Sequence, residues 1–419
     1  MNLTITPQLL TGTVSVVSSK SLSHRYVIAA GLSLGKSVIT NVLDSDDLDA
    51  TKLALSKLGV TFNGREIIGN QLKLTSSTID CHESGSTLRF MIPIALLQEK
   101  KVRFIGSGRL QDRPLDVYFE IFDEKKIDYK KPLNQSLPLE VKGPLKPGYF
   151  KLRGDISSQF LTGLLFALPL LEDDSIIELS TPLESRGYVD LTLDVLTQFG
   201  IHILVVDQFF YIKGNQKYKP LIASVEGDFS QAAFWMVAGL IGQTIKISSI
   251  NPRSKQGDAE IIEIIKQMHG SITYHAFQNE YQIDPSKTDG MTIDLSQIPD
   301  LGPILMVLAA LSKGTTKFIN ASRLRIKESD RLDAMYQTLK KFGVNIVISD
   351  DEAIIEGRDT LKGNQEFDTF GDHRIAMAIA IAAIRADGEV TIMNADVVKK
   401  SYPDFYKVYQ SVGGKIRES

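Results

Sequence analysis

The chain has a single cysteine, Cys81, among its 419 residues. One thiol cannot form an internal disulfide, and it cannot supply a metal site built from several cysteines. Nothing beside Cys81 indicates an activated thiolate, so we expect it to be a small core residue. This cysteine usage favours a reducing, cytoplasmic setting.

Long apolar runs are also lacking. Runs such as Ile375–Ile384 are well short of the roughly 20 residues that a membrane-spanning helix needs. The opening residues, Met1–Ile5, show no basic stretch followed by an apolar one, so we expect no signal peptide. The sequence therefore predicts a protein that does not associate with a membrane.

An excess of positive charge is absent as well, because 47 Lys and Arg against 50 Asp and Glu leave a net charge of −3. Nucleic-acid-binding proteins are usually strongly basic, so we expect no nucleic-acid partner. The length of 419 residues and a hydrophobic content of 43% are typical of a soluble protein with two domains. Any positively charged site must come from a local cluster.

What the sequence does contain is an internal repeat of about 70 residues. Glycines that end a helical pattern recur at Gly59, Gly200 and Gly343, and in a looser form at Gly270 and Gly414. A less regular member ends near Ile127. Six such units account for the whole chain.

Each unit begins with an apolar helix, continues with a β-rich stretch and then has an amphipathic helix with apolar residues three or four apart. The apolar helices are expected at Ser23–Gly31, Ser86–Leu97, Ser158–Leu171, Ser230–Leu240, Asp300–Leu311 and Asp372–Ile384. They are apolar almost all round, which predicts burial. This order predicts two α/β domains of three units each, divided near residues 226–230; an ordinary doubly wound α/β protein is the alternative.

Several apolar helices start within clusters of Ser, Lys and Arg. A helix start presents unpaired backbone N–H groups, which can hold an anion. The clusters are Ser18–Arg25, Glu83–Arg89, Gly154–Gln159 and Gly371–Arg374. Each alone is usually just a helix cap, but recurrence at the same place in the repeat predicts a shared anion site.

Two further segments add local charge. Arg113 stands immediately before Pro114, which favours an extended backbone. The segment Arg323–Arg331 packs four cations and two carboxylates into nine residues. A solvated charged turn is the ordinary alternative, but arginine forks suit phosphate and carboxylate because they bind two oxygens at once.

Three single residues are also candidates. Asp300 could merely cap its helix, and Lys400 could merely be solvated. His373 has the best functional case of the six histidines, because Asp372 and Arg374 flank it.

Together these segments resemble the 5-enolpyruvylshikimate-3-phosphate synthase (3-phosphoshikimate 1-carboxyvinyltransferase) family of enolpyruvyl transferases. The resemblance runs from about Val14 to Pro403 in the family's order. The matching motifs are Ser19-Lys20-Ser21 with Ser23-His24-Arg25, Leu43-Asp44-Ser45-Asp46-Asp47, Ser157-Ser158-Gln159-Phe160, Ile326-Lys327-Glu328-Ser329-Asp330-Arg331 and Asp372-His373-Arg374.

The resemblance implies an α/β fold with two inside-out barrel domains, built from six βαβαββ repeats. The expected domains are residues 19–226 and, discontinuously, residues 1–18 plus 227–419, with the active site in the cleft between them. The implied reaction transfers the enolpyruvyl group of phosphoenolpyruvate to the 5-hydroxyl of 3-phosphoshikimate, without a cofactor or metal. The family also implies a monomer, and Gly85 with Ser86 resembles glyphosate-sensitive members.

The family motifs also imply roles for individual residues. Those expected to hold 3-phosphoshikimate are Lys20, Ser21, Arg25, Ser157, Ser158, Gln159, Ser185, Tyr188, Asp300 and Lys327. Those expected to hold phosphoenolpyruvate are Lys20, Gly85, Arg113, Gln159, Arg331, His373, Arg374 and Lys400. The catalytic residues are expected to be Glu328 for proton transfer at the methylene carbon, Asp300 for the hydroxyl and Lys20 for phosphate departure. Arg89 is expected to be structural.

Two positions depart from the family pattern. Val17-Ser18 stands where Pro-Gly is common, and Glu83 stands where Asn is frequent. A carboxylate pointing toward a trianion would be unfavourable, so we expect Glu83 to turn away or to pair with a cation.

Two other functions compete with this interpretation. UDP-N-acetylglucosamine enolpyruvyl transferases usually carry a Cys in the loop matching Ile105–Pro114, and this stretch has none. A catalytically silent anion-binding scaffold would not need Lys20, Asp300 and Glu328 together.

Overall fold

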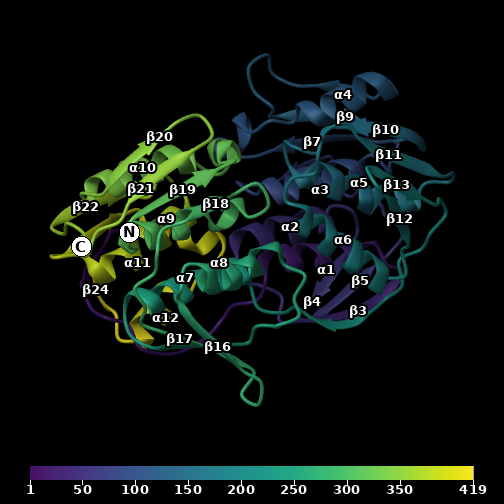
Figure 1. The fold of residues 1–419 in the computed structure, drawn as a ribbon. Helices are drawn as coiled ribbons and strands as arrows, with labels where there is room; N and C mark the ends of the chain where they lie inside the picture. Colours follow the sequence, from purple (N-terminus) through teal and green to yellow (C-terminus); the bar gives the residue numbers. More distant parts are fainter. Residues whose placement is uncertain (419) are drawn as a thin grey trace. The chain divides into compact units, whose positions relative to one another are not determined.

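The computed structural model describes residues 1–418. Contacts within the chain divide it into two compact units (Figure 1). The inserted unit is Ser18–Val225, and the discontinuous unit is Met1–Val17 with the segment from Glu226 onward. The boundaries expected from the sequence lie one residue further along the chain.

One repeat of the discontinuous unit shows the βαβαββ pattern in full. Its elements are β18 (Thr292–Asp294), α9 (Gly302–Leu311), β19 (Thr315–Ile319), α10 (Arg331–Lys341), β20 (Asn345–Ile348) and β21 (Ala353–Glu356). Strand β18 is parallel to β19, whereas β21 is antiparallel to both β19 and β20. The predicted α/β repeat is confirmed here.

The other two sheets of this unit use strands from distant parts of the chain. Their orders are β16 (Ser271–His275), β17 (Glu280–Asp284), β15 (Ile245–Ser248), β2 (Gly12–Ser15), and β22 (Gln365–Asp368), β23 (Val390–Met393), β1 (Leu3–Thr6), β24 (Lys415–Glu418). Leu3 pairs with Glu418, so strands from both ends of the chain lie in one sheet. Figure 1 shows the marks for the two chain ends close together. The first strands of the chain thus complete the fourth and sixth repeats.

The inserted unit has three sheets of the same kind within the described residues. Their orders are β14 (Ile222–Ser224), β3 (Gly35–Thr40), β5 (Glu66–Gly69), β4 (Thr61–Asn63); β6 (Thr78–Asp80), β7 (Lys101–Ile105), β9 (Leu139–Lys142), β8 (Asp128–Lys130); and β10 (Gly148–Leu152), β11 (Ser175–Leu179), β13 (Phe209–Ile212), β12 (Ile203–Val206). Strand β14, the last of the unit, lies parallel to β3 and supplies the first strand of the first repeat.

The six apolar helices are buried, as predicted. They are α1 (Lys20–Leu32), α3 (Gly85–Ala95), α5 (Ser158–Ala167), α7 (Phe229–Ile241), α9 and α11 (His373–Ala382). Every residue of α9 and α11 is buried. In the discontinuous unit α7, α9 and α11 pack against one another, and in the inserted unit α3 packs against α5. Within the described residues, no helix has the length and apolar character needed to cross a membrane.

The second helices of the six repeats are, in chain order, α2 (Asp46–Ser56), α4 (Asp116–Lys125), α6 (Arg186–Gln198), α8 (Ile261–Gln267), α10 and α12 (Phe405–Ser411). Gly59, Gly200 and Gly343 follow three of these helices with a left-handed backbone, at φ of +90°, +80° and +79°. At the two looser positions the left-handed residue is His269 or Gly413, one residue before Gly270 or Gly414. In the irregular second repeat Lys126, with φ of 55°, takes this position. Left-handed geometry rather than glycine itself is therefore what repeats.

Two predicted helix starts are displaced by more than one residue. Helix α1 begins at Lys20, three residues before Ser23, because Ser19 caps it. Asp300 lies in a short 3-10 turn, Pro299–Leu301, ahead of α9 rather than in the helix.

Candidate active site

The three buried helices of the inserted unit start at serine caps. Ser19 Oγ accepts a hydrogen bond from Leu22 N at 3.4 Å, and Ser84 Oγ accepts one from Thr87 N at 3.2 Å. Ser157 Oγ accepts from Gln159 N at 3.3 Å. These three serines therefore do cap their helices, as the ordinary interpretation of the sequence predicts.

Lys20 is the first residue of α1. Its Nζ lies 2.9 Å from Asp47 Oδ2 on α2, and the two side chains are 15% and 13% exposed. The ion pair holds the ammonium group at the helix start. Asp47 belongs to a recognised motif, but its role as the partner of Lys20 was not predicted.

Arg25 lies one turn further along α1 and is buried. It donates hydrogen bonds to Ser21 O at 2.7 Å, Tyr188 O at 2.8 Å and Thr192 Oγ1 at 2.8 Å. These acceptors are neutral, and burial lowers the pKa of Arg25 to about 10. A buried cation with neutral acceptors favours an incoming anion. The structure therefore brings Ser21, Arg25 and Tyr188 together.

Gln159, near the start of α5, is held by two neighbours. Arg89 Nη1 donates to its Oε1 at 2.7 Å, and its Nε2 donates to Ser86 Oγ at 2.9 Å. Arg89 also donates to Pro114 O at 3.0 Å and lies over the ring of Phe160. These contacts suit the structural role expected of Arg89.

Gly85 and Arg113 are in direct contact. A Cβ at Gly85 would lie 2.5 Å from Arg113 Nη1. The exposed Glu83 directs its carboxylate at Gly108, where a Cβ would lie 2.8 Å from Glu83 Cδ. That Glu83 turns away from a bound anion stays a prediction.

The remaining expected residues of this unit lie at two helix starts. Ser158 is the first residue of α5 and is buried. Ser185 precedes α6 with a left-handed backbone, at φ of 54°, and is buried.

Arg331, at the start of α10, is the centre of the charged cluster in the discontinuous unit. Its Nε lies 2.8 Å from Asp372 Oδ2, its Nη1 2.8 Å from Asp300 Oδ1 and its Nη2 2.8 Å from Glu328 Oε2. Burial alone would lower the pKa of Arg331, but these three carboxylates raise it above the ordinary value. A single buried guanidinium thus orients both carboxylates expected to be catalytic.

Asp300 has two further cationic neighbours. Lys327 Nζ lies 3.3 Å from its Oδ1, and Arg374 Nη2 lies 3.2 Å from its Oδ2. Arg374 Nη1 also donates to Asp300 O at 3.1 Å. Burial lowers the pKa of Lys327 to about 8, although the Asp300 carboxylate opposes this shift. Lys327 can therefore gain or lose a proton near neutral pH.

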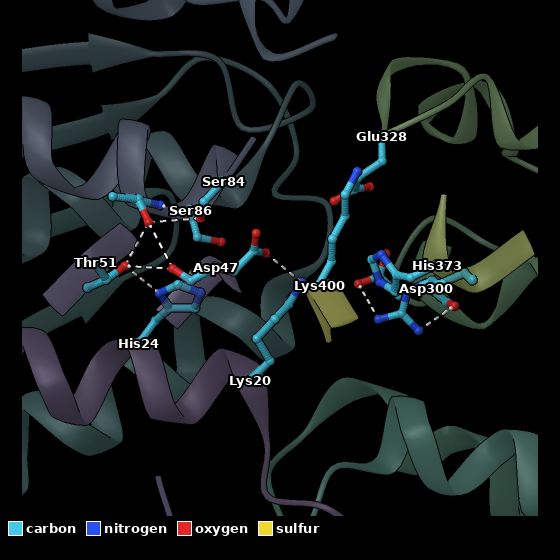
Figure 2. A network of polar contacts seen from close by, with 12 residues as sticks. Lys20, His24, Asp47, Thr51, Ser84, Ser86, Asp300, Glu328, His373 and Lys400 are labelled. Carbon is cyan, nitrogen blue, oxygen red and sulfur yellow. Dashed lines mark hydrogen bonds and ion pairs between the residues drawn. The ribbon is translucent and has the colours of Figure 1, made fainter. Parts of the chain in front are cut away.

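His373 is the first residue of α11, and Lys400 lies near the start of that helix. His373 is buried, with Nδ1 3.9 Å from Asp372 Oδ1 (Figure 2). Lys400 Nζ donates to Gly371 O at 3.0 Å. Within residues 1–418, no group of three or more His, Cys, Asp and Glu residues is arranged to hold a metal ion.

Sequence reasoning missed two acidic residues of this cluster. Asp372 caps α11 by accepting from Arg374 N at 2.9 Å, and Ser329 Oγ donates to its Oδ2 at 3.0 Å. Its place inside a family motif was the available signal. Asp258 is buried and accepts a hydrogen bond from Ser230; burial and the nearby Asp300 raise its pKa to about 6. No sequence signal marked Asp258.

Known proteins are similar to this chain over nearly its whole length. A family model described as EPSP synthase (3-phosphoshikimate 1-carboxyvinyltransferase) matches residues 5–409. A 3-phosphoshikimate 1-carboxyvinyltransferase of Clostridium acetobutylicum is 49% identical, over 99% of this chain and 98% of that protein. One from Clostridioides difficile is 46% identical, over 100% and 98%.

Solved structures agree with the sequence relatives. EPSP synthase from Acinetobacter baumannii matches with a TM-score of 0.82 at 25% identity, covering 100% of both chains. The enolpyruvyl transferase NikO from Streptomyces tendae matches in fold, with a TM-score of 0.79 at 15% identity, over 99% of this chain and 98% of that chain.

Proposed function

Because the chain belongs to the EPSP synthase (3-phosphoshikimate 1-carboxyvinyltransferase) family, we propose that its two charged clusters hold the two substrates of that reaction. The enzyme transfers the enolpyruvyl group of phosphoenolpyruvate to 3-phosphoshikimate in aromatic biosynthesis. The alternative, transfer to UDP-N-acetylglucosamine, is not favoured by this membership.

In this proposal 3-phosphoshikimate is held mainly by the inserted unit. Arg25 supplies a buried positive charge whose present acceptors are neutral oxygens. The start of α5 supplies backbone N–H groups, hydroxyls and an amide for the phosphate. The residues concerned are Lys20, Ser21, Arg25, Ser157, Ser158, Gln159, Ser185 and Tyr188, with Asp300 and Lys327 at the ring hydroxyls.

Phosphoenolpyruvate carries a phosphate and a carboxylate, so it needs several cations. We assign Lys20, Gly85, Arg113 and Gln159 from the inserted unit, and Arg331, His373, Arg374 and Lys400 from the discontinuous unit. Each unit contributes only part of this set.

The observation that carries the catalytic assignment is the placement of Asp300 and Glu328 on one buried arginine, each 2.8 Å from Arg331. Asp300 accepts the proton of the 5-hydroxyl while the hydroxyl oxygen attacks C2 of phosphoenolpyruvate. Glu328 donates a proton to C3, which gives a tetrahedral adduct. Phosphate then leaves C2, assisted by Lys20, and the proton that Asp300 accepted goes to the departing phosphate. Glu328 takes a proton back from C3 to restore the double bond.

A phosphate-release assay tests this function. Release is expected only when both substrates are present, and no release with 3-phosphoshikimate would overturn the proposal. Asp300→Ala should lose turnover by orders of magnitude while still binding 3-phosphoshikimate, as measured by calorimetry. A scaffold that only binds anions would show no turnover in either protein.

We also propose three finer properties. Glyphosate should inhibit competitively with phosphoenolpyruvate, and insensitivity at millimolar glyphosate would contradict this. The protein should be a monomer, which sedimentation can measure. It should act in the cytoplasm, which its single cysteine favours and cell fractionation can test.

A further inference from the structure

A chain of buried hydroxyl groups connects three helices of the inserted unit (Figure 2). His24 Nδ1 on α1 lies 2.8 Å from Thr51 Oγ1 on α2. Thr51 Oγ1 lies 2.7 Å from Thr87 Oγ1 on α3, and Thr87 Oγ1 donates to Ser84 Oγ at 2.8 Å. All four residues are at most 1% exposed. None of them has been assigned a contact with substrate.

The burial of His24 decides the direction of its hydrogen bond to Thr51. Burial, together with Lys20 and Arg25, holds the pKa of His24 well below its usual value, so the ring is neutral. Its Nε2 is buried and has no hydrogen-bond partner in the part of the chain that the structure describes. A buried unpaired donor is costly, which favours placing the proton on Nδ1. His24 then donates to Thr51, and each threonine proton lies between two acceptors: Thr87 Oγ1 and Asp47 O for Thr51, and Ser84 Oγ and Asp47 O for Thr87.

This chain of hydrogen bonds contacts two segments that carry groups assigned to phosphoenolpyruvate, one at its middle and one at its Ser84 end. Both threonine hydroxyls also lie near Asp47 O, at 3.4 Å from Thr51 and 3.3 Å from Thr87. The side chain of Asp47 holds Lys20 at 2.9 Å. Ser84 caps α3, whose first residue is Gly85.

We propose that Thr51 and Thr87 are positioning residues that set the Lys20 ammonium and the Gly85 helix start relative to each other, and thereby set the affinity for the phosphate of phosphoenolpyruvate. The inference rests on the proposed roles of Lys20 and Gly85. Both threonines act through Asp47 and Ser84 and do not touch the substrate. Rigid support of this kind matters because small displacements of charged groups weaken binding steeply.

The test compares Thr51→Val, which keeps the shape and removes the hydroxyl, with Thr51→Ser, which restores it. Thr51→Val should raise the KM for phosphoenolpyruvate about tenfold, since it breaks the chain in the middle. The Kd for 3-phosphoshikimate should change by less than about twofold, because Lys20 is only one of many residues assigned to it, whereas Arg25 and α5 lie outside the chain. Thr51→Ser should return the KM to within about twofold of the parent.

Thr316→Val is the matched control, because Thr316 is a buried threonine whose hydroxyl has no hydrogen-bond partner among the described residues. Thr316→Val should leave the KM for phosphoenolpyruvate and the Kd for 3-phosphoshikimate unchanged. Thr87→Val provides a second break in the chain if Thr51→Val fails to fold, as judged by thermal melting. It should show the same selective rise in KM.

Three outcomes would overturn the inference. The first is that Thr51→Val and Thr316→Val have the same KM for phosphoenolpyruvate, while Lys20→Met has a raised KM. Another is equal weakening of both substrates, which would indicate general loss of packing. An unchanged KM in Lys20→Met would overturn the assignment of Lys20 itself, and the inference with it.

Discussion

The guanidinium of Arg113 lies directly against the α-carbon of Gly85. A Cβ built on Gly85 would be 2.5 Å from Arg113 Nη1 and 2.8 Å from its Cζ. Real side chains do not approach so closely, so the absence of a side chain at residue 85 is what allows this contact. The backbone of Gly85 is helical rather than left-handed, so close approach and not backbone freedom explains the glycine.

Gly85→Ala should therefore displace Arg113 and raise the KM for phosphoenolpyruvate by about tenfold or more, from the loss of a charge-assisted contact. Stability should change little, because a flexible side chain can move away. Steady-state kinetics measure the effect. In a double-mutant cycle with Arg113→Ala the two changes should be far from additive; full additivity would show that Gly85 acts independently of Arg113.

Lys327 should impose a pH limit on substrate capture. Burial lowers its pKa to about 8, so in the free enzyme its positive charge is lost as the pH rises through that value. The kcat/KM for 3-phosphoshikimate should fall above about pH 8. Lys327→Arg keeps its charge to much higher pH, so its profile should lack this fall. An identical decline in both proteins would contradict the role of Lys327.

The buried ion pair between Arg331 and Asp372 should be costly to break. Asp372 is fully buried and lies 2.8 Å from Arg331 Nε. Asp372→Asn leaves part of a buried positive charge uncompensated, and the free energy of unfolding should fall by about 3 kcal/mol. Urea denaturation measures this change. The control Asp174→Asn removes an exposed ion pair with Lys213 and should have little effect. Equal effects would contradict the argument.

Asp258 should make stability depend on pH. Burial, with Asp300 and Asp228 nearby, raises its pKa from 3.8 to about 6, although Arg374 and Ser230 oppose the shift. The neutral carboxyl stabilises the fold below the unfolded pKa, and this contribution is lost as the pH rises through about 6. Asp258→Asn cannot ionise, so it should melt at a higher temperature than the parent at pH 8 and lose most of this advantage near pH 4.5. An advantage that is the same at both values would exclude ionisation of Asp258 as its cause.

Much of the architecture could be predicted because it depends on residues that are close together in the sequence. Six apolar helices, their serine-rich starts and the glycines near the ends of the amphipathic helices each depend on residues a few positions apart. The motifs that carry the family resemblance, such as Ile326–Arg331, are equally local. Where the prediction erred, as at Gly270 and Gly414, the error was one residue, because His269 and Gly413 adopt the left-handed conformation instead.

By itself, then, the sequence determined the repeat, the class of fold and the family. Only the tertiary structure decided that Leu3 pairs with Glu418, that Ile222 pairs with Val38, and that Arg331 joins Asp300, Glu328 and Asp372. Helix periodicity and capping act over one or two turns, so they are readable along the chain. Strand partners, buried ion pairs and shifted pKa values depend on which distant residues exclude water together, and folding alone brings those residues into contact.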